Sequence, residues 1–213
     1  VKMITCGEGG AVITNNKDYY INADQYQDHG HDHIGSDRGA ETHPFMGYNY
    51  RISELHAAVG LGQLEKFDDI LAIQKRNYTI VRDALSTIDG LTFRKVPEGG
   101  EENYSFVNFF LPNEELAKKA HKTLGDAGVD ANFYWYTNNW HYINGWEHLR
   151  NIKSLGNVTD EVRNQLEKLN DTDFSKSDAI MSRTISSLVK IGWKVDEVKE
   201  RAEKMRAAIA SVL

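Results

Sequence analysis

The order of the apolar patterns after residue 71 is the feature that most constrains the fold of this chain. The spacing of apolar residues predicts a helix, two strands, a helix and a strand, over residues 72–87, 91–96, 104–111, 114–127 and 129–136. An exposed helix over 161–169, a capped turn at 177–183, a strand over 184–191 and an amphipathic helix over 195–213 complete the chain. This order is typical of an α+β domain, so we expect one domain over residues 1–71 and another over residues 72–213.

Core positions in this second domain follow from the helical spacing. Asn113 is predicted to cap the helix at residues 114–127, because its side chain can accept a hydrogen bond from a free backbone N–H. The predicted buried positions of the first and last helices are Ile73, Tyr78, Val81 and Leu85, and then Val198, Ala202, Met205 and Ile209.

The first domain opens with a lysine, Lys2, just before a glycine-rich turn at residues 7–10. Glycine adopts positive φ without steric cost, so the backbone can double back here. A lysine beside such a bend is a candidate for carbonyl chemistry, because desolvation frees its amine as a nucleophile; the alternative is an ordinary surface lysine. Residues 11–13 are predicted to form a short buried strand that ends at Asn15 and Asn16.

A helix is predicted after Ser53, which is a suitable N-cap, with Glu54 placed favourably in the first turn. Its apolar residues recur at helical spacing and are predicted to be core: Leu55, Ala58, Val59, Leu64, Phe67 and Leu71.

Composition narrows the class of protein. The chain has 25 Lys and Arg against 31 Asp and Glu, a net charge of -6, which argues against a binder of nucleic acid or of anionic membranes. The sequence has no apolar run long enough for a membrane span.

Cys6 is the single cysteine, so an intrachain disulfide is excluded and a reducing compartment, the cytoplasm, is expected. Cys6 as a catalytic nucleophile is the alternative, but no base is indicated beside it.

Residues 22–44 are predicted to form a long polar loop that is rich in histidine and aspartate. His29, His31 and His33 alternate, so they would project from one side of an extended segment. Imidazoles and carboxylates can bind zinc or iron, but this spacing matches no metal-site signature, and we assign no metal. The alternative is a solvated loop or an active-site lid that uses histidines as hydrogen-bonding groups.

Aromatic and amide side chains gather at residues 133–142. Such a set is typical of a binding wall in which aromatic rings stack on a sugar and amides bind the sugar hydroxyls. The candidate residues for this wall are Tyr134, Trp135, Asn139 and His141. The alternative is that these side chains pack in the core. Arg183 is a candidate for binding a substrate carboxylate through two parallel hydrogen bonds, against a structural ion pair.

Two segments carry a family resemblance. Residues 2–15, Lys-Met-Ile-Thr-Cys-Gly-Glu-Gly-Gly-Ala-Val-Ile-Thr-Asn, resemble the cofactor-lysine segment of the DegT-type, pyridoxal-phosphate-dependent sugar aminotransferases. His29-Gly30 and residues 47–66, from Gly-Tyr-Asn-Tyr-Arg-Ile-Ser-Glu-Leu onward, resemble a second segment of the same family. The resemblance implies an α/β, type I aminotransferase fold, with a large domain built on a mixed or mostly parallel sheet and a smaller C-terminal α+β domain.

By this resemblance, residues 1–71 would be the end of the large cofactor-binding domain and residues 72–213 the small domain. Family members carry a long segment before the lysine, which holds the phosphate-binding loop and the groups that contact the cofactor ring. We therefore expect this chain to lack the N-terminal part of the enzyme and to be inactive alone.

The resemblance implies transamination with pyridoxal 5′-phosphate. Lys2 would carry the cofactor as a Schiff base and later move a proton, with glutamate as the amino donor. Dehydratase relatives have histidine in place of this lysine, so Lys2 favours amino transfer. Asn49 matches the family residue that reaches the cofactor phosphate of the other subunit, which implies a homodimer with a shared active site.

Three further segments, residues 28–35, 134–142 and 177–186, resemble family members that act on 8-oxo-3-deoxy-manno-octulosonate for lipopolysaccharide biosynthesis. The substrate contacts would then come from His29, Tyr134, Trp135, Asn139, His141 and Arg183. Three alternatives stay open: a nucleotide-linked keto-sugar as the acceptor, a non-catalytic regulator of the same fold, and a metal-dependent hydrolase built on the histidine loop.

Overall fold

The computed structural model describes residues 2–138 and 140–213. The chain divides into two compact units, residues 1–69 and 70–213. Helix α3 (Phe67–Ser86) begins just before this boundary and belongs mostly to the second unit. No helix in the described ranges is long and apolar enough to cross a membrane.

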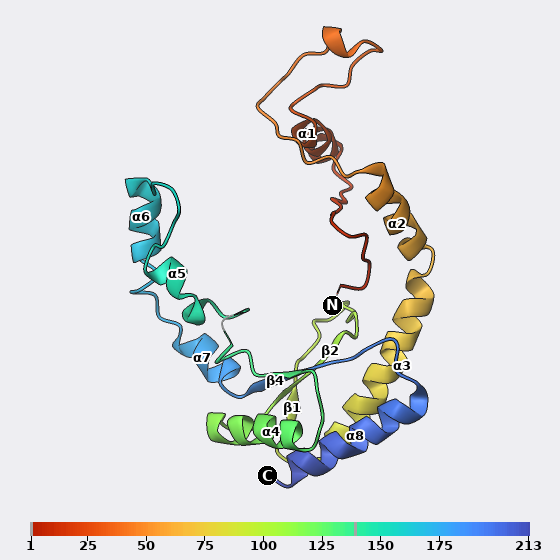
Figure 1. Ribbon diagram of the computed structural model, residues 1–213, viewed down its shortest axis with the longest axis vertical. Helices are drawn as coiled ribbons and strands as arrows, with labels where there is room; N and C mark the ends of the chain where they lie inside the picture. The colour runs from red at the N-terminus through yellow and green to blue at the C-terminus, as the bar shows by residue number, and fades with distance from the viewer. Residues whose placement is uncertain (1, 139) are drawn as a thin grey trace. The chain divides into compact units, whose positions relative to one another are not determined.

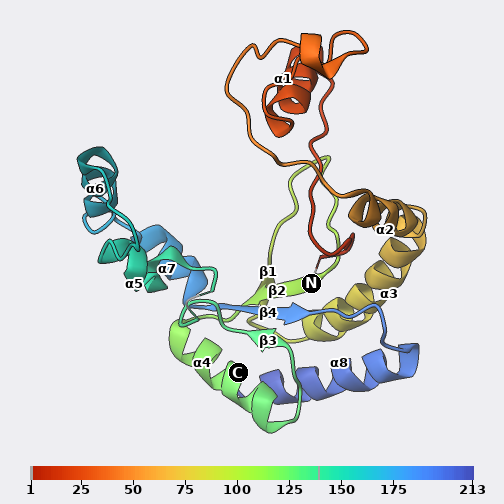
Figure 2. The same ribbon diagram turned by 45° about the horizontal axis from the view of Figure 1, so that its top comes forward.

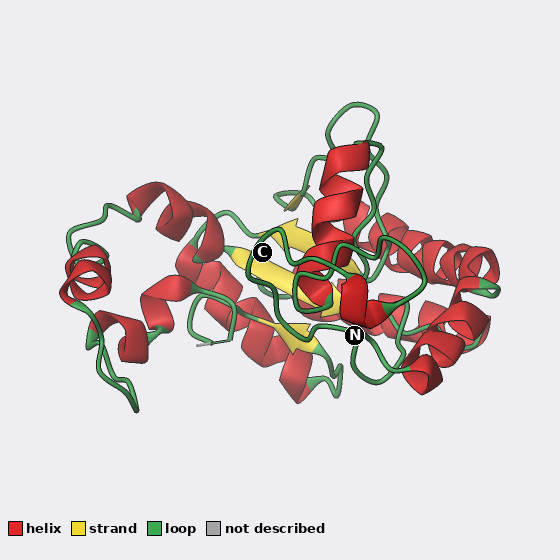
Figure 3. Cartoon of the chain, turned by 90° about the horizontal axis from the view of Figure 1, so that it is seen from above, coloured by secondary structure: helices red, strands yellow, loops and turns green. Residues whose placement is uncertain are grey.

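The second unit is built on one antiparallel sheet with strand order β1-β2-β4-β3. Figure 3 draws its strands in yellow. The strands are β1 (Thr92–Phe93), β2 (Phe106–Phe110), β3 (Asn132–Phe133) and β4 (Thr184–Leu188). Phe109 pairs with Ile185 and Val107 with Ser187, so these four side chains leave the same face of the sheet. All four strands were predicted, but β1 and β3 keep only two residues each, because only those residues pair with a neighbouring strand.

Among the described residues of this unit, six helices surround or extend the sheet: α3, α4 (Glu114–Asp126), α5 (Glu147–Arg150), α6 (Asp160–Glu167), α7 (Ser175–Met181) and α8 (Val195–Ala210). A 3₁₀ turn, η2, spans Ile143–Gly145. Asn113 caps α4 as predicted, since its Oδ1 accepts the backbone N–H of Leu116 at 2.9 Å. The predicted turn at 177–183 is wrong in one respect, because most of it is the helical segment α7.

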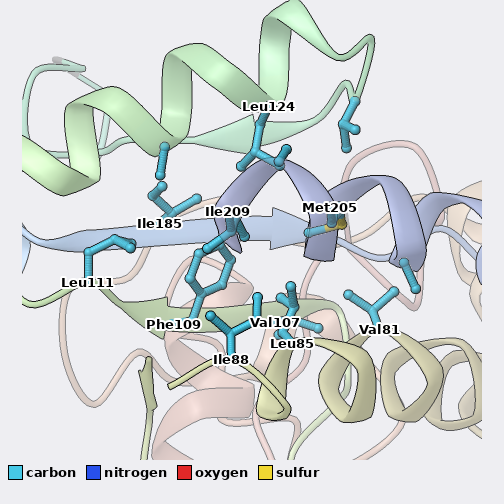
Figure 4. Close-up of a cluster of buried hydrophobic side chains, with 14 of the residues drawn as sticks. Val81, Leu85, Ile88, Val107, Phe109, Leu111, Leu124, Ile185, Met205 and Ile209 are labelled. Carbon is cyan, nitrogen blue, oxygen red and sulfur yellow. The ribbon is translucent and has the colours of Figure 1, made fainter. Parts of the chain in front are cut away.

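The core of the second unit lies between the sheet and helices α3, α4 and α8. Figure 4 shows Leu124 from α4, Met205 and Ile209 from α8, Val81 and Leu85 from α3, and Val107, Phe109 and Ile185 from the strands converging on one cluster. Helices α4 and α8 lie side by side (Figure 2). The predicted buried stripe of α8 is confirmed at all four positions, whereas in α3 Val81 and Leu85 are buried but Ile73 is exposed.

The first unit contains α1 (Lys17–Gln27), the 3₁₀ turn η1 (Arg38–Ala40) and α2 (Glu54–Leu64). Helix α1 was not predicted: Asn16, expected to end a strand, is its N-cap and accepts the backbone N–H groups of Asp18 and Tyr19. The predicted buried strand at residues 11–13 is wrong. Val12 and Ile13 are 76% and 94% exposed, and no backbone hydrogen bond from the described residues reaches this segment, as a strand would require.

Helix α2 begins as predicted, with Ser53 Oγ accepting the backbone N–H of His56 at 3.3 Å. Its apolar stripe, however, is not core: Leu55 is 80% exposed, Val59 51% and Leu64 53%. Periodicity identifies the apolar face of a helix, but burial also needs a covering surface, and the described residues of this unit do not supply one.

Between α1 and α2 the chain leaves the end of α1, forms a loop and returns beside it (Figure 1). The returning strand-like segment is fixed by backbone hydrogen bonds from His29 N to Tyr48 O and from Tyr50 N to Gln27 O, both 2.9 Å. Gly47 allows this approach, because a Cβ there would lie 2.4 Å from the backbone nitrogen of Gly30.

Candidate functional site

The structure brings the two family-like segments of the first unit into contact. Gly7 has φ +87°, and a Cβ added there would lie 3.1 Å from two ring atoms of His56 in α2. A Cβ on Gly9 would lie 2.7 Å from Ile52 Cδ1, just before the same helix. The glycines therefore let the turn after Lys2 pack directly against the start of α2.

Lys2 is exposed, and its amine makes no hydrogen bond or ion pair with any residue that the structure describes. The first unit contains a cavity of ≈ 780 Å³, which is lined by the turn at residues 7–10, by α1 and by the start of α2. Its lining residues include Gly9, Gly10, Arg51 and His56. The cavity is bounded by the same turn that follows Lys2, although Lys2 itself is not one of the lining residues.

Asn49 lies on the returning segment and is exposed. It forms an isolated antiparallel bridge with Asp28, and its Oδ1 accepts the Nε–H of Arg51 at 3.1 Å. The side chain of Asn49 is thus held by a neighbour on its own segment.

Asp28 is a buried carboxylate with three cationic partners. Its Oδ2 lies 2.8 Å from Arg38 Nη2 and 3.2 Å from His33 Nε2, and its Oδ1 lies 3.1 Å from Arg51 Nη1. Burial by itself would raise the pKa of Asp28, but the hydrogen bond from His33 and the charges of the two guanidinium groups outweigh it and hold the pKa below its usual value. Sequence analysis missed Asp28 and Arg51, because only the fold brings these charges together.

The rings of the three alternating histidines are neighbours, with centroids 6.4 Å apart from His29 to His31 and from His31 to His33, but His31 and His33 pair with different carboxylates. His33 Nδ1 lies 2.7 Å from Asp24, whereas His31 Nδ1 lies 2.9 Å from Glu41 and its ring contacts that of His43. His29 has φ +60°, so the segment is not extended as the sequence suggested. Among residues 2–138 and 140–213, no group of three or more His, Cys, Asp or Glu side chains is arranged to hold a metal ion.

In the second unit, part of the predicted aromatic wall is assembled. The rings of Phe133 and Trp135 stack in parallel with centroids 4.6 Å apart, and His141 meets Trp135 edge to face at 4.7 Å. Trp140 extends the cluster and is 63% exposed. Asn139 lies outside the described residues.

Tyr134 is buried and supports this wall from the core side. Its hydroxyl donates to the backbone carbonyl of Ser182 at 2.6 Å, and burial raises the pKa of Tyr134 to about 12. Tyr142, also buried, donates to Asp178 of α7, and burial together with this hydrogen bond raises its pKa to about 12. The wall is therefore tied to α7 at Asp178 and to the residue that follows the helix, Ser182.

Arg183 comes directly before β4. Its guanidinium lies 5.2 Å from the ring centroid of Phe110, and Nη1 donates to the carbonyl of Leu111 at 3.3 Å. Within the described part of the chain it forms no ion pair with a carboxylate.

The chain belongs to the DegT/DnrJ/EryC1/StrS aminotransferase family, whose model matches residues 1–170. Members of this family are pyridoxal-phosphate-dependent aminotransferases. The chain is 34% identical over 135 residues to GDP-perosamine synthase of Escherichia coli O157:H7, with 63% of this chain and 35% of that protein aligned. It is 41% identical over 143 residues to the UDP-4-amino-4,6-dideoxy-N-acetyl-beta-L-altrosamine transaminase of Campylobacter jejuni, covering 63% of this chain and 36% of that protein.

Among solved structures, AtS13 from Actinomadura melliaura superimposes with a TM-score of 0.68 at 20% identity, over 99% of this chain and 48% of the other. The predicted type I aminotransferase fold is confirmed for the part that this chain spans. The chain spans little more than a third of the two curated relatives, 35% and 36% of their lengths.

The residues present fit pyridoxal 5′-phosphate. The amine of Lys2 has no hydrogen-bond or ion-pair partner among the described residues, so it is available to a cofactor aldehyde; its side chain is exposed, so the desolvation expected from the sequence is not seen within the described residues. The Oδ1 of Asn49 already accepts from Arg51, so its amide nitrogen can donate to a phosphate. A Cβ at Gly10 would meet nothing within 4 Å, which leaves open space at the turn.

Proposed function

We propose that the full-length protein transfers an amino group, with glutamate as the donor, to the carbonyl carbon of a sugar. The observation that carries the proposal is the packing of the turn at residues 7–10 against His56 and Ile52 at the start of α2. This packing joins the two segments that resemble the cofactor site of the family to which the chain belongs.

In this proposal Lys2 is the residue that would hold pyridoxal 5′-phosphate, its Nζ joined to the aldehyde carbon with loss of water, and as a free amine it would move a proton at the substrate carbon. The bound cofactor supplies an electron sink. Asn49 donates its amide N–H groups to the cofactor phosphate of the partner subunit, so the active site is shared within a homodimer. Residues 1–71 then belong to the large domain and residues 72–213 to the small domain.

For the sugar acceptor, two candidates have separate support. The two relatives above are, by name, a GDP-perosamine synthase and a UDP-linked amino-sugar transaminase, which favours a nucleotide-linked keto-sugar. The resemblance of residues 28–35, 134–142 and 177–186 to enzymes of octulosonate amination supports 8-oxo-3-deoxy-manno-octulosonate and a role in lipopolysaccharide biosynthesis.

Acceptor contacts in the proposal come from Trp135 and His141, whose rings already lie against each other. Tyr134 contributes by anchoring this wall to Ser182. Arg183 binds a carboxylate. His29 and Asn139 complete the proposed contacts on the strength of the resemblance alone.

The single cysteine supports a reducing compartment, and we place the protein in the cytoplasm.

An absorbance experiment tests the amino-transfer chemistry. The full-length protein, purified with pyridoxal 5′-phosphate, is expected to be yellow and to lose that colour when glutamate is added, because the cofactor then carries the amino group. A yellow protein that no amino donor bleaches would support the regulator instead, and a protein that takes up no cofactor would contradict the proposal.

A second assay separates the acceptors. The bleached protein is mixed in parallel with 8-oxo-3-deoxy-manno-octulosonate and with GDP- and UDP-linked 4-keto-sugars, and recovery of the yellow colour is timed. Recovery with the octulosonate alone assigns the free sugar acid, whereas recovery with a nucleotide-linked sugar alone assigns that class.

A further inference from the structure

We propose that Asp28 is a positioning residue: it holds Arg51 so that Arg51 orients the amide of Asn49 with its N–H donors free for a phosphate. The inference rests on the proposed function, because it concerns how the cofactor phosphate is recognised. All three residues lie in the first unit.

The backbone places the three side chains together. Asp28 and Asn49 pair across the bridge, flanked by the hydrogen bonds of His29 with Tyr48 and of Tyr50 with Gln27. In an antiparallel pair of this kind the two side chains lie close together and on the same side. Arg51 follows Asn49 by two residues, so in an extended segment it projects to that side as well.

Chemistry then fixes the direction of the Asn49 amide. A guanidinium group has only donors, so the side-chain atom of Asn49 that faces Arg51 Nε at 3.1 Å is its oxygen. The nitrogen of the amide, with two N–H donors, therefore faces away from Arg51. Since Asn49 is exposed, these donors are accessible to an anion.

Asp28 fixes Arg51 in turn. In the part of the chain that the structure describes, Asp28 is the only carboxylate at ion-pair distance from Arg51, with Oδ1 3.1 Å from Nη1. The Asp28 side chain is 7% exposed and that of Arg51 42%, so the ion pair is shielded from water on the Asp28 side, and Oδ1 of Asp28 has no other partner among the described residues. Arg38 and His33 occupy the other oxygen, which leaves Oδ1 to Arg51.

The test compares two ligands that differ only in the phosphate. Dissociation constants of pyridoxal 5′-phosphate and of pyridoxal are measured on the cofactor-free, full-length protein and on its Asp28→Asn variant. We expect Asp28→Asn to weaken the binding of pyridoxal 5′-phosphate about tenfold, because the Asn49 amide would lose its hydrogen bond to the charged phosphate. The dissociation constant of pyridoxal, which has no phosphate, should stay unchanged.

Asp32→Asn is the matched control. Asp32 belongs to the same loop and accepts the backbone N–H groups of Ile34 and Thr42, but it has no contact with Arg51. We expect its dissociation constants to match those of the wild type. Equal weakening by both variants, or equal weakening of both ligands, would show a general loosening of the loop and overturn the inference.

A double-mutant comparison keeps the test decisive if Asp28→Asn fails to fold. Arg51→Met leaves Asp28 paired with Arg38 and His33, and it should give the same loss, confined to the phosphate-bearing ligand. Combining Arg51→Met with Asn49→Ser should weaken binding no further than the stronger single change, because both act on one amide. Additive losses of about a hundredfold would overturn the inference.

The outcomes also separate the two proposals. A wild-type protein that binds neither ligand contradicts the proposed function and this inference with it. A wild-type protein that binds pyridoxal 5′-phosphate, with Asp28→Asn and Arg51→Met equal to it, contradicts this inference alone.

Discussion

Asn77 of α3 donates its side-chain amide to the backbone carbonyl of Lys190, 3.0 Å away and just beyond the end of β4. Asn77 is fully buried, and its Oδ1 accepts from the guanidinium group of Arg76. One turn earlier, Gln74 is also buried and donates to the carbonyls of Tyr104 and Val189. Helix α3 is therefore fixed to the strands by amides inside the core as well as by Val81 and Leu85.

Replacing Asn77 with alanine should lower the free energy of unfolding of the second unit by about 2 kcal/mol, because it leaves the Lys190 carbonyl without this buried donor. Denaturant unfolding of the purified chain measures this. Thr79→Ala, on the exposed side of the same helix, is the control and should change stability by less than about 0.5 kcal/mol. Equal effects of the two substitutions would contradict the structural role of Asn77.

Stability of the first unit should depend on the ionisation of His33. Hydrogen bonds to Asp24 and then to Asp28 raise the pKa of His33 above its ordinary value of 6.5. A group with a raised pKa in the folded state contributes stability that is complete below the unfolded pKa and is lost as the pH rises through the folded pKa. We therefore expect the His33 contribution to be complete below pH 6.5 and to be lost as the pH rises from 6.5 through the raised pKa of the folded state.

Proton NMR titration of the histidine rings checks this expectation. The His33 resonance should titrate with a midpoint above 6.5, and Asp24→Asn should lower that midpoint. A midpoint at or below 6.5 in the unsubstituted chain would show that the two carboxylates do not hold the imidazolium.

Trp135 should contribute to binding of the sugar acceptor. In the full-length protein, Trp135→Ala is expected to raise the KM for the acceptor about tenfold, since one aromatic stacking contact has roughly this effect, and to leave the KM for glutamate unchanged. Trp135→Phe, which keeps a ring beside Phe133 and His141, should recover most of the loss. An unchanged acceptor KM in Trp135→Ala would assign the stack to packing alone.

Substitution of Arg183 tests whether its guanidinium group binds a substrate carboxylate or only stabilises the fold. If its guanidinium binds a carboxylate, Arg183→Ala should raise the KM for glutamate or for an acidic sugar about tenfold or more, with a smaller rise for Arg183→Lys. Steady-state kinetics with both substrates measures this. If the apparent affinity for both acids stays the same, the contacts of Arg183 with Phe110 and Leu111 are its whole function.

The parts of the fold that the sequence predicted best are those fixed by local chemistry. Ser53 and Asn113 are helix caps as expected, because capping depends on one side chain and the next turn of backbone. The buried stripe of α8 is also as expected, since a helix against a sheet buries the face that periodicity identifies.

Predictions failed where burial or pairing depends on distant partners. Residues 11–13 have the apolar composition of a strand but no strand beside them, and the stripe of α2 at Leu55 and Val59 is exposed. Helix α1 was missed although Asn16 and Asp18 are ordinary helix-start residues, because its apolar residues show no clear periodicity.

Among the residues of the candidate site, some were likewise predicted from local sequence and others became apparent only in the folded chain. Lys2 and Asn49 were identified from the sequence through motif resemblance. Asp28 and Arg51 were not, since the importance of a carboxylate among three cations depends on a bridge that only the folded loop creates. Tyr134 and His141 stand near each other in sequence, yet the structure buries the first and exposes the second.

The most direct test of the account is to locate the cofactor on the chain. The full-length protein is loaded with pyridoxal 5′-phosphate, reduced with borohydride, digested and analysed by mass spectrometry. We predict that the reduced cofactor is found on the peptide that contains Lys2, and that Lys2→Ala abolishes the modification without unfolding the protein. A cofactor fixed on another lysine, or none fixed at all in a protein that has bound it, would contradict the account.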